Sequence, residues 1–161
     1  MHHDDDDDLR RLYAKGKASF SVTIEVESAS LSAVDGDPYV VAYVTTDREG
    51  TKRKTSVVKR TLEPAWHQKV RLDGVPPTAT LAVVIKAERI GPNERVCACE
   101  ISVLDAMDHR REEVVVLDLS GERASSGKLR CAFRFDPPVP SFDDQIRVTQ
   151  VDGHTCLLMD Y

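Results

Sequence analysis

Six basic residues gather between positions 48 and 60, where Glu49 is the single acid, so six positive charges less one give +5. Such a density of positive side chains suits binding to phosphates, and each group beside an anionic membrane contributes about 1 kcal/mol. The alternative is a solvated strand edge on which lysines prevent aggregation. We call residues 48–60 the basic segment. Its positive side chains are Arg48, Lys52, Arg53, Lys54, Lys59 and Arg60.

Within this segment, strand alternation would send Lys52 and Lys54 to one face and Arg53 to the other. Tyr43, on the strand expected just before, would pack beside the two lysines. Candidate residues for binding lipid or another anionic partner are therefore Lys52, Arg53, Lys54, Lys59, Arg60 and Tyr43.

The run Asp4–Asp8 is the densest negative feature. The 161 residues include 22 Lys and Arg and 27 Asp and Glu, a formal net charge of −5, so the chain without this run is neutral. Binding to nucleic acid is not expected, because such proteins need a positive excess to neutralise phosphates. A terminal run of like charges is usually solvated. Its charge also matches that of the basic segment, which it could cover.

No arrangement of reactive residues indicates catalysis. The chain shows no nucleophile turn, glycine-rich phosphate loop or paired metal motif. We interpret His67, His109 and His154 as structural or surface residues. The sequence therefore predicts no catalytic residue, no cofactor and no enzymatic activity.

The four cysteines, at positions 97, 99, 131 and 156, are predicted to be free thiols. No signal peptide is recognisable, which favours a reducing, cytoplasmic compartment. On one strand face, Cys97 and Cys99 would lie about 6.6 Å apart, near the upper limit for a disulfide. A Cys-x-Cys pair without a second ligand pair is a weak zinc signal.

Apolar residues alternate with polar ones along most of the chain, which is typical of antiparallel strands with one buried face. Two weaker candidates, Thr55–Val58 and Trp66–Leu72, bring the total to eight short strands. The stretch around Leu104–Arg111 could form a short helix or a loop. The six clear alternating runs begin at Phe20, Val40, Leu81, Cys97, Val115 and Leu129.

Turn residues separate these runs, so we predict one all-β sandwich over residues 19–136. Residues 1–18, acidic and then basic, are expected to form a flexible arm. Residues 137–161 form a tail that starts with a proline-rich stretch and could add a strand or dock on a partner.

Three segments resemble the C2 domain family. Residues 31–40 end in Asp-Pro-Tyr-Val, residues 54–66 end in Thr-Leu-Glu-Pro-Ala-Trp, and residues 81–96 resemble its last strand and acidic loop. The resemblance implies an eight-stranded antiparallel β-sandwich, which occurs in two circular permutations. Residues 128–135 alternate well, whereas residues 9–18 are too charged, so we predict the type II permutation with the extra strand at the C-terminus.

The resemblance also implies a calcium site made by five aspartates. The corresponding residues here are Leu31, Asp37, Lys86, Glu88 and Glu94. An ammonium group about 4 Å from a divalent ion costs roughly 8 kcal/mol at an effective dielectric constant near 20. We therefore predict no metal site, with Lys86 blocking it. Lys86 would pair instead with Asp37 or Glu94, either as an internal cation or as a weak exposed pair.

These observations predict a non-catalytic, calcium-independent docking module. The favoured function is protein–protein interaction or scaffolding in a cytoskeletal, ciliary or trafficking assembly, with a partner that the sequence does not identify. The alternative is peripheral binding to anionic phospholipids or phosphoinositides through Lys52 and Lys54. Both functions agree with a cytoplasmic protein associated with the cytoskeleton, a cilium or a membrane.

Overall fold

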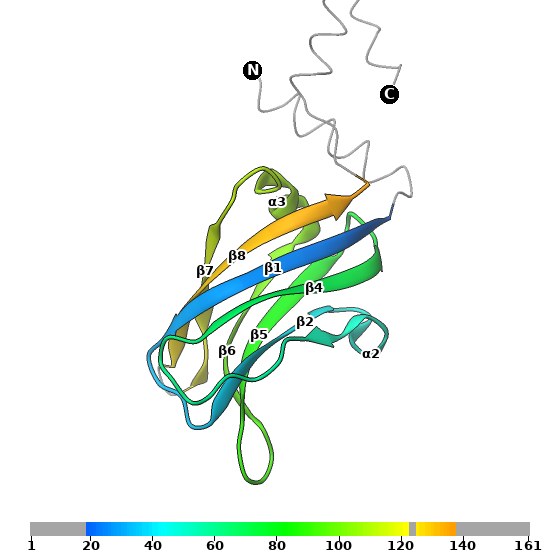
Figure 1. Cartoon of the computed structure of the whole chain (residues 1–161). Coiled ribbons are helices and arrows are strands. Elements are labelled where there is room, and N and C mark those ends of the chain that lie inside the picture. The colour runs from blue at the N-terminus through cyan, green and yellow to red at the C-terminus, as the bar shows by residue number, and fades with distance from the viewer. Residues whose placement is uncertain (1–18, 123–124, 138–161) are drawn as a thin grey trace, which may run out of the picture.

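The computed structural model describes residues 19–122 and 125–137 (Figure 1). Eight antiparallel strands and two short helices make up this part of the chain. The helices are α2 (Arg48–Thr51) and α3 (Val103–Asp108). The strands are β1 (Phe20–Leu31), β2 (Asp37–Val44), β3 (Arg53–Lys54), β4 (Ala65–Val75), β5 (Thr80–Glu88), β6 (Glu94–Ser102), β7 (Val115–Ser120) and β8 (Ser126–Asp136).

The strands follow one another in the order β3-β2-β5-β6-β7-β8-β1-β4. Between β6 and β7 the register holds one residue pair, Ala98 with Ser120, so the structure divides there into two four-stranded layers. This arrangement confirms the predicted eight-stranded β-sandwich. The C-terminal strand β8 lies between β7 and β1, which confirms the type II permutation.

Alternation places one side chain in two between the layers. Phe20, Val22, Ile24 and Val26 of β1 are buried, as are Leu129, Cys131 and Phe133 of β8. The indole nitrogen Nε1 of Trp66 in β4 donates to the carbonyl of Pro38 in β2 at 3.2 Å, which ties the two layers together. Burying each large apolar side chain stabilises the fold by about 1.5–3 kcal/mol.

Two expectations about local structure were inaccurate. Thr55–Val58 is not a strand, because β3 comes earlier and is only two residues long. The helix α2 was not expected; the Asp47 carboxylate caps it by accepting from the amide of Gly50 at 3.2 Å. The stretch for which helix and loop were both expected forms α3 in its first part. The expectations for residues 1–18 and for the tail beyond 137 lie outside the described residues.

The three described cysteines are free thiols, as predicted. Cys97 and Cys131 are buried and Cys99 is half-buried. Burial raises the pKa of Cys97 and Cys99 to about 11 and that of Cys131 to about 12. Cys156 lies outside the described part of the chain. Within the described residues, no helix is long and apolar enough to cross a membrane.

We predict that a chain ending at Gly121 does not fold, whereas a chain ending at Pro137 does. The shorter chain lacks β8 and with it three buried core side chains, Leu129, Cys131 and Phe133. Their loss removes several kcal/mol, a large part of an ordinary stability of about 5–15 kcal/mol. Circular dichroism during urea unfolding measures this. A cooperative transition in the shorter chain would contradict the prediction.

Candidate functional site

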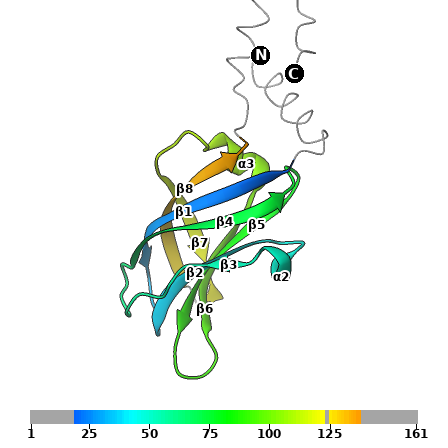
Figure 2. The same ribbon diagram turned by 45° about the vertical axis from the view of Figure 1, so that its right-hand side comes forward.

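Two buried threonines hold the start of the basic segment against β2. The backbone amide of Val44 donates to the hydroxyl of Thr51 at 2.8 Å, and the amide of Val40 donates to that of Thr55 at 3.0 Å. The backbone amide of Thr55 in turn donates a hydrogen bond to the carbonyl of Val40. These bonds satisfy the backbone of β2 on the side where β3 contributes only two residues. They hold the chain just before and just after β3, which carries Lys54 and lies beside β2 (Figure 2).

The outer face of this layer is apolar at its base. Tyr39, Val41 and Val84 are buried in a second cluster separate from the main core, with Tyr43 and Ala98 partly buried beside them. The residues opposite one another in the central part of this face form three rows across the strands, and the acidic pair Asp37–Glu88 follows at the loop end. These rows are Lys54–Val41–Val84–Ala98, Tyr39–Lys86–Arg95 and Tyr43–Ala82–Glu100.

Positive side chains surround this apolar base. Lys54 Nζ lies 5.9 Å from the centre of the Tyr39 ring, and Arg48 of α2 lies 5.1 Å over Tyr43. Lys86 and Arg95 stand side by side in the middle row. Such cation–π contacts are worth about 0.5–1 kcal/mol each at exposed sites. We call Lys54, Lys86, Arg95 and Arg48, together with the two tyrosines, the cationic face.

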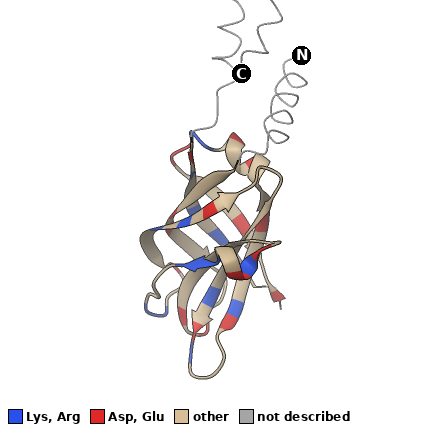
Figure 3. Cartoon of the chain, turned by 90° about the vertical axis from the view of Figure 1, so that its right-hand side faces the viewer, with Lys and Arg blue, Asp and Glu red and all other residues tan. Residues whose placement is uncertain are grey.

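This face carries a net positive charge. On the three rows, four cations including Arg48 meet one carboxylate, that of Glu100, which leaves +3; the next row of the same face, Asp37–Glu88, adds two acids and lowers the total to +1. Figure 3 shows Lys and Arg segments on α2, on β3 and on the neighbouring strands. None of the four cations forms an ion pair with an acid among the described residues. The side chain of Asn93 donates to the Tyr39 hydroxyl at 2.8 Å, which holds this ring from the other end.

The structure separates the residues that were predicted to bind together. Lys54 and Tyr43 belong to the cationic face, but Tyr43 lies under Arg48 and Lys54 lies over Tyr39. Arg53 is opposite the inward-facing Ala42 and therefore projects away from that face. Lys52 precedes β3 as the C-cap of α2, so strand alternation does not apply to it. Lys59 and Arg60 lie in loop 55–64, near the other end of β2.

Lys86 and Arg95 complete the face although they are distant from the basic segment in sequence. They are opposite each other in the β5–β6 hairpin. Counting outward from the turn at Gly91 could have paired them. The one-residue irregularity between Ile85 and Lys86, however, has no visible sequence signal.

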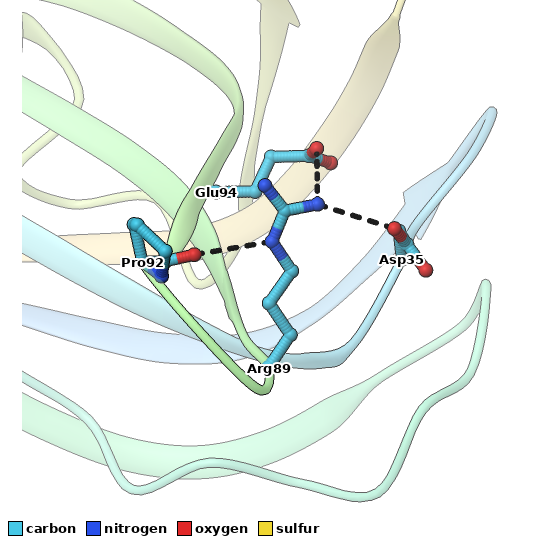
Figure 4. A network of polar contacts seen from close by, with 4 residues as sticks. All are labelled: Asp35, Arg89, Pro92 and Glu94. Carbon is cyan, nitrogen blue, oxygen red and sulfur yellow. Dashed lines mark hydrogen bonds and ion pairs between the residues drawn. The ribbon is translucent and has the colours of Figure 1, made fainter.

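Arg89 joins two loops at the end of the sandwich away from the described termini (Figures 1 and 4). Its Nη1 lies 3.2 Å from Oδ2 of Asp35 in loop 32–36 and 3.0 Å from Oε2 of Glu94, at the start of β6. Its Nε donates to the carbonyl of Pro92 at 3.1 Å. Gly36 permits the close approach of the loops, because a Cβ at this position would lie 2.5 Å from the carbonyl oxygen of Glu88.

The hypothesis that Lys86 pairs with Asp37 or Glu94 is therefore wrong. Lys86 lies on the outer face and forms no ion pair with the described residues, and the cation that pairs with Glu94 is Arg89. Asp37 Oδ1 accepts from the backbone amide of Arg60 at 2.9 Å and so shapes loop 55–64. Among the described residues, no group of three or more His, Cys, Asp or Glu side chains is placed to hold a metal ion.

The same end of the sandwich exposes two large apolar side chains. Ile90 in loop 89–93 is fully exposed, and Leu62 in loop 55–64 is half exposed. Leu31, by contrast, is buried and its amide donates to the carbonyl of Leu62. Arg60 and Leu62 line a shallow hollow there with Val34.

A sandwich with this strand order and these loops defines a known class of domain. The sequence model of the C2 domain matches residues 20–119, which is more than half of the chain. The chain therefore belongs to the C2 domain family. The match ends before β8, the strand that the permutation places last.

The chain is similar in sequence to synaptotagmin-3 of two mammals. Synaptotagmin-3 of Mus musculus is 32% identical over 109 residues, and synaptotagmin-3 of Homo sapiens matches to the same extent. These alignments cover 62% of this chain but only 18% of either relative's length.

Solved structures share the fold at lower identity. The first C2 domain of plant Extended Synaptotagmin 1 is 18% identical, with a TM-score of 0.57 over 75% of this chain and 96% of that one. Human GIVD cytosolic phospholipase A2 is 19% identical, with the same score over 73% of this chain and 15% of the enzyme. Extended-Synaptotagmin 2 with calcium bound is 17% identical, with a TM-score of 0.57. The match covers 73% of this chain and 45% of that one.

We predict that replacing Arg89 with Met lowers the free energy of unfolding by about 0.5–1 kcal/mol at low salt. Both of its ion pairs are partly exposed, and such pairs are worth little each. Urea unfolding measures the change, which should shrink at about 1 M salt. Arg95→Met is the matched control, because Arg95 has no acidic partner among the described residues. An equal loss in both variants would refute a tethering role for Arg89.

Proposed function

We propose that the chain is a non-catalytic, calcium-independent docking module that binds anionic phospholipid surfaces through its cationic face. The observation that carries this proposal is the placement of Lys54, Lys86, Arg95 and Arg48 over an apolar base, whose three central rows hold one carboxylate, that of Glu100. Four cations held by separate elements can meet several headgroups at once. Membership of the C2 family and the similarity to synaptotagmin-3 support the proposal.

The geometry favours this function over protein scaffolding. A protein interface generally needs a contiguous apolar centre with a polar rim. Here Tyr39, Val41 and Val84 are buried, and Lys54 lies over the Tyr39 ring, so the outer face offers charged groups instead of a contiguous exposed apolar centre. Cations without an ion-pair partner among the described residues keep their attraction for an anionic ligand, since no internal pair has to be broken first.

We predict that Lys54→Gln/Lys86→Gln/Arg95→Gln weakens binding to phosphatidylserine vesicles on the order of 100-fold. Three groups at about 1 kcal/mol each give this change. Sedimentation with vesicles at about 0.1 M salt measures it, with a parallel series that contains phosphatidylinositol bisphosphate. Binding by the native protein should weaken as salt rises.

The matched control for this experiment is Lys69→Gln/Lys128→Gln/Arg130→Gln. It removes the same charges from the second layer, where Arg130 pairs with Glu27 and Lys128 pairs with Asp118. This control should bind nearly as well as the native protein. Equal losses in both triple variants would show that net charge alone acts. No binding of the native protein to any vesicle would overturn the lipid proposal in favour of a protein partner.

We predict that about 1 mM calcium changes neither the thermal midpoint of unfolding nor vesicle binding. Arg89 already neutralises Asp35 and Glu94, and Asp37 is bonded to the backbone of loop 55–64. Calcium needs six to eight oxygen ligands, mostly carboxylates. Differential scanning fluorimetry with magnesium as the control measures this. A calcium-specific rise in the midpoint would contradict calcium independence.

A further inference from the structure

The first strand begins close to the basic segment. Phe20, the first residue of β1, is buried and is opposite Val75 at the end of β4. Beside it, the hydroxyl of Ser21 donates to Oδ1 of Asp73 at 2.6 Å. The described chain therefore begins next to the end of β4 (Figure 1).

The positive charge of Arg53, in the basic segment, also stabilises the carboxylate of Asp73. The pKa of Asp73 is lowered first by the hydrogen bond from Ser21, then by Arg71, and also by the positive charge of Arg53. This electrostatic effect requires β3 to lie near the outer end of β4, and the two strands are in contact. Residues 48–54 and the start of β1 are thus separated by about one strand spacing and one layer spacing, roughly 15 Å.

The beginning of the basic segment holds uncompensated charge. Within residues 48–54, Arg48, Lys52, Arg53 and Lys54 stand against Glu49, so four positive charges less one give +3. All four side chains are on exposed residues, and none of them pairs with an acid in the described ranges. This surface attracts the nearest dense negative group.

We infer that the run Asp4–Asp8 occupies residues 48–54 when no membrane is present, and competes there with anionic lipid. Eleven residues lie between Asp8 and Phe20, and extended they span at most about 35 Å. That reach is more than twice the separation estimated above. The charges of −5 and +3 are complementary. The competition with lipid rests on the proposed function, whereas the contact itself does not.

Tethering makes a weak contact effective. A short linker holds the two partners at an effective concentration of about a millimolar. If the contact alone dissociates at about 0.25 mM, the run occupies its site most of the time and reduces lipid affinity about fivefold. The contact is ionic and exposed, so it should disappear at about 0.5 M salt, where the screening length is only a few ångströms.

The contact is tested by NMR with a spin label at position 3, introduced as His3→Cys in a Cys156→Ser background. Raised pKa values keep the three remaining thiols protonated at neutral pH, which favours labelling at position 3. We expect selective broadening of the amides of residues 48–54, with those of residues 126–130 as internal reference. The broadening should be lost at high salt and in the variant with Asp4–Asp8 changed to Asn. Equal broadening in both proteins, or none at residues 48–54, would overturn the inference.

The competition is tested with phosphatidylserine vesicles at about 50 mM salt. The Asn variant should bind about five times more tightly than the native chain, whereas the control Asp143→Asn/Asp144→Asn should bind like the native chain. Unchanged affinity with the NMR contact present would overturn the competition. If the contact is present and neither protein binds vesicles, the proposed function fails while the contact stands, so the two failures are distinguishable.

Discussion

The edge of β2 is the constraint on which the candidate site depends. A buried strand cannot leave its amides without acceptors, because each unsatisfied group costs about 1–3 kcal/mol. Here β3 pairs with only two residues of β2, and the side-chain hydroxyls of Thr51 and Thr55 supply the missing acceptors. Both hydroxyls belong to the segment that carries the positive charges. The same hydrogen bonds therefore satisfy the backbone of β2 and position Lys54. Two uncharged residues, Thr51 and Thr55, fix the segment that carries the charged ones.

The layer that contains β2 buries apolar side chains on both of its sides, whereas an antiparallel sheet in a sandwich commonly buries them on one side only. Its inner side packs in the core, and its outer side carries Tyr39, Val41 and Val84 beneath long cationic side chains. These stems shield the tyrosines while the charged groups remain in water. A ligand that attracts the ammonium and guanidinium groups outward would uncover aromatic surface. Charge and apolar contact are thus coupled in one surface.

Alternation in the sequence was sufficient to predict the sandwich, because one buried side chain in two is a local pattern that six runs repeat. It also located the C-terminal strand, since residues 128–135 alternate and the charged residues before Phe20 do not. The candidate site was harder to predict from the sequence. The charge of the basic segment was visible, but its division between the cationic face, the β4 side and loop 55–64 depends on a two-residue strand. Arg89 was missed because its partners come from two loops whose approach depends on Gly36, a tertiary contact without periodicity. Lys86 and Arg95 are distant from the basic segment in sequence, and the irregularity between Ile85 and Lys86 places Arg95 on the same face as Ala98, three residues further on, which alternation alone does not predict.

The neighbouring positions of the two described chain ends determine how this domain would respond to tension. Ser21 of β1 is opposite Asp136 of β8, so force applied through the preceding and following chain acts on one end of one antiparallel strand pair. Such a force opens the ladder one bond after another, as a zipper opens, instead of shearing all its bonds together. The pair β1–β8 lies in the middle of the second layer, and its separation would expose the core at once. A fold that is cooperative toward denaturants would thus be mechanically weak along this axis.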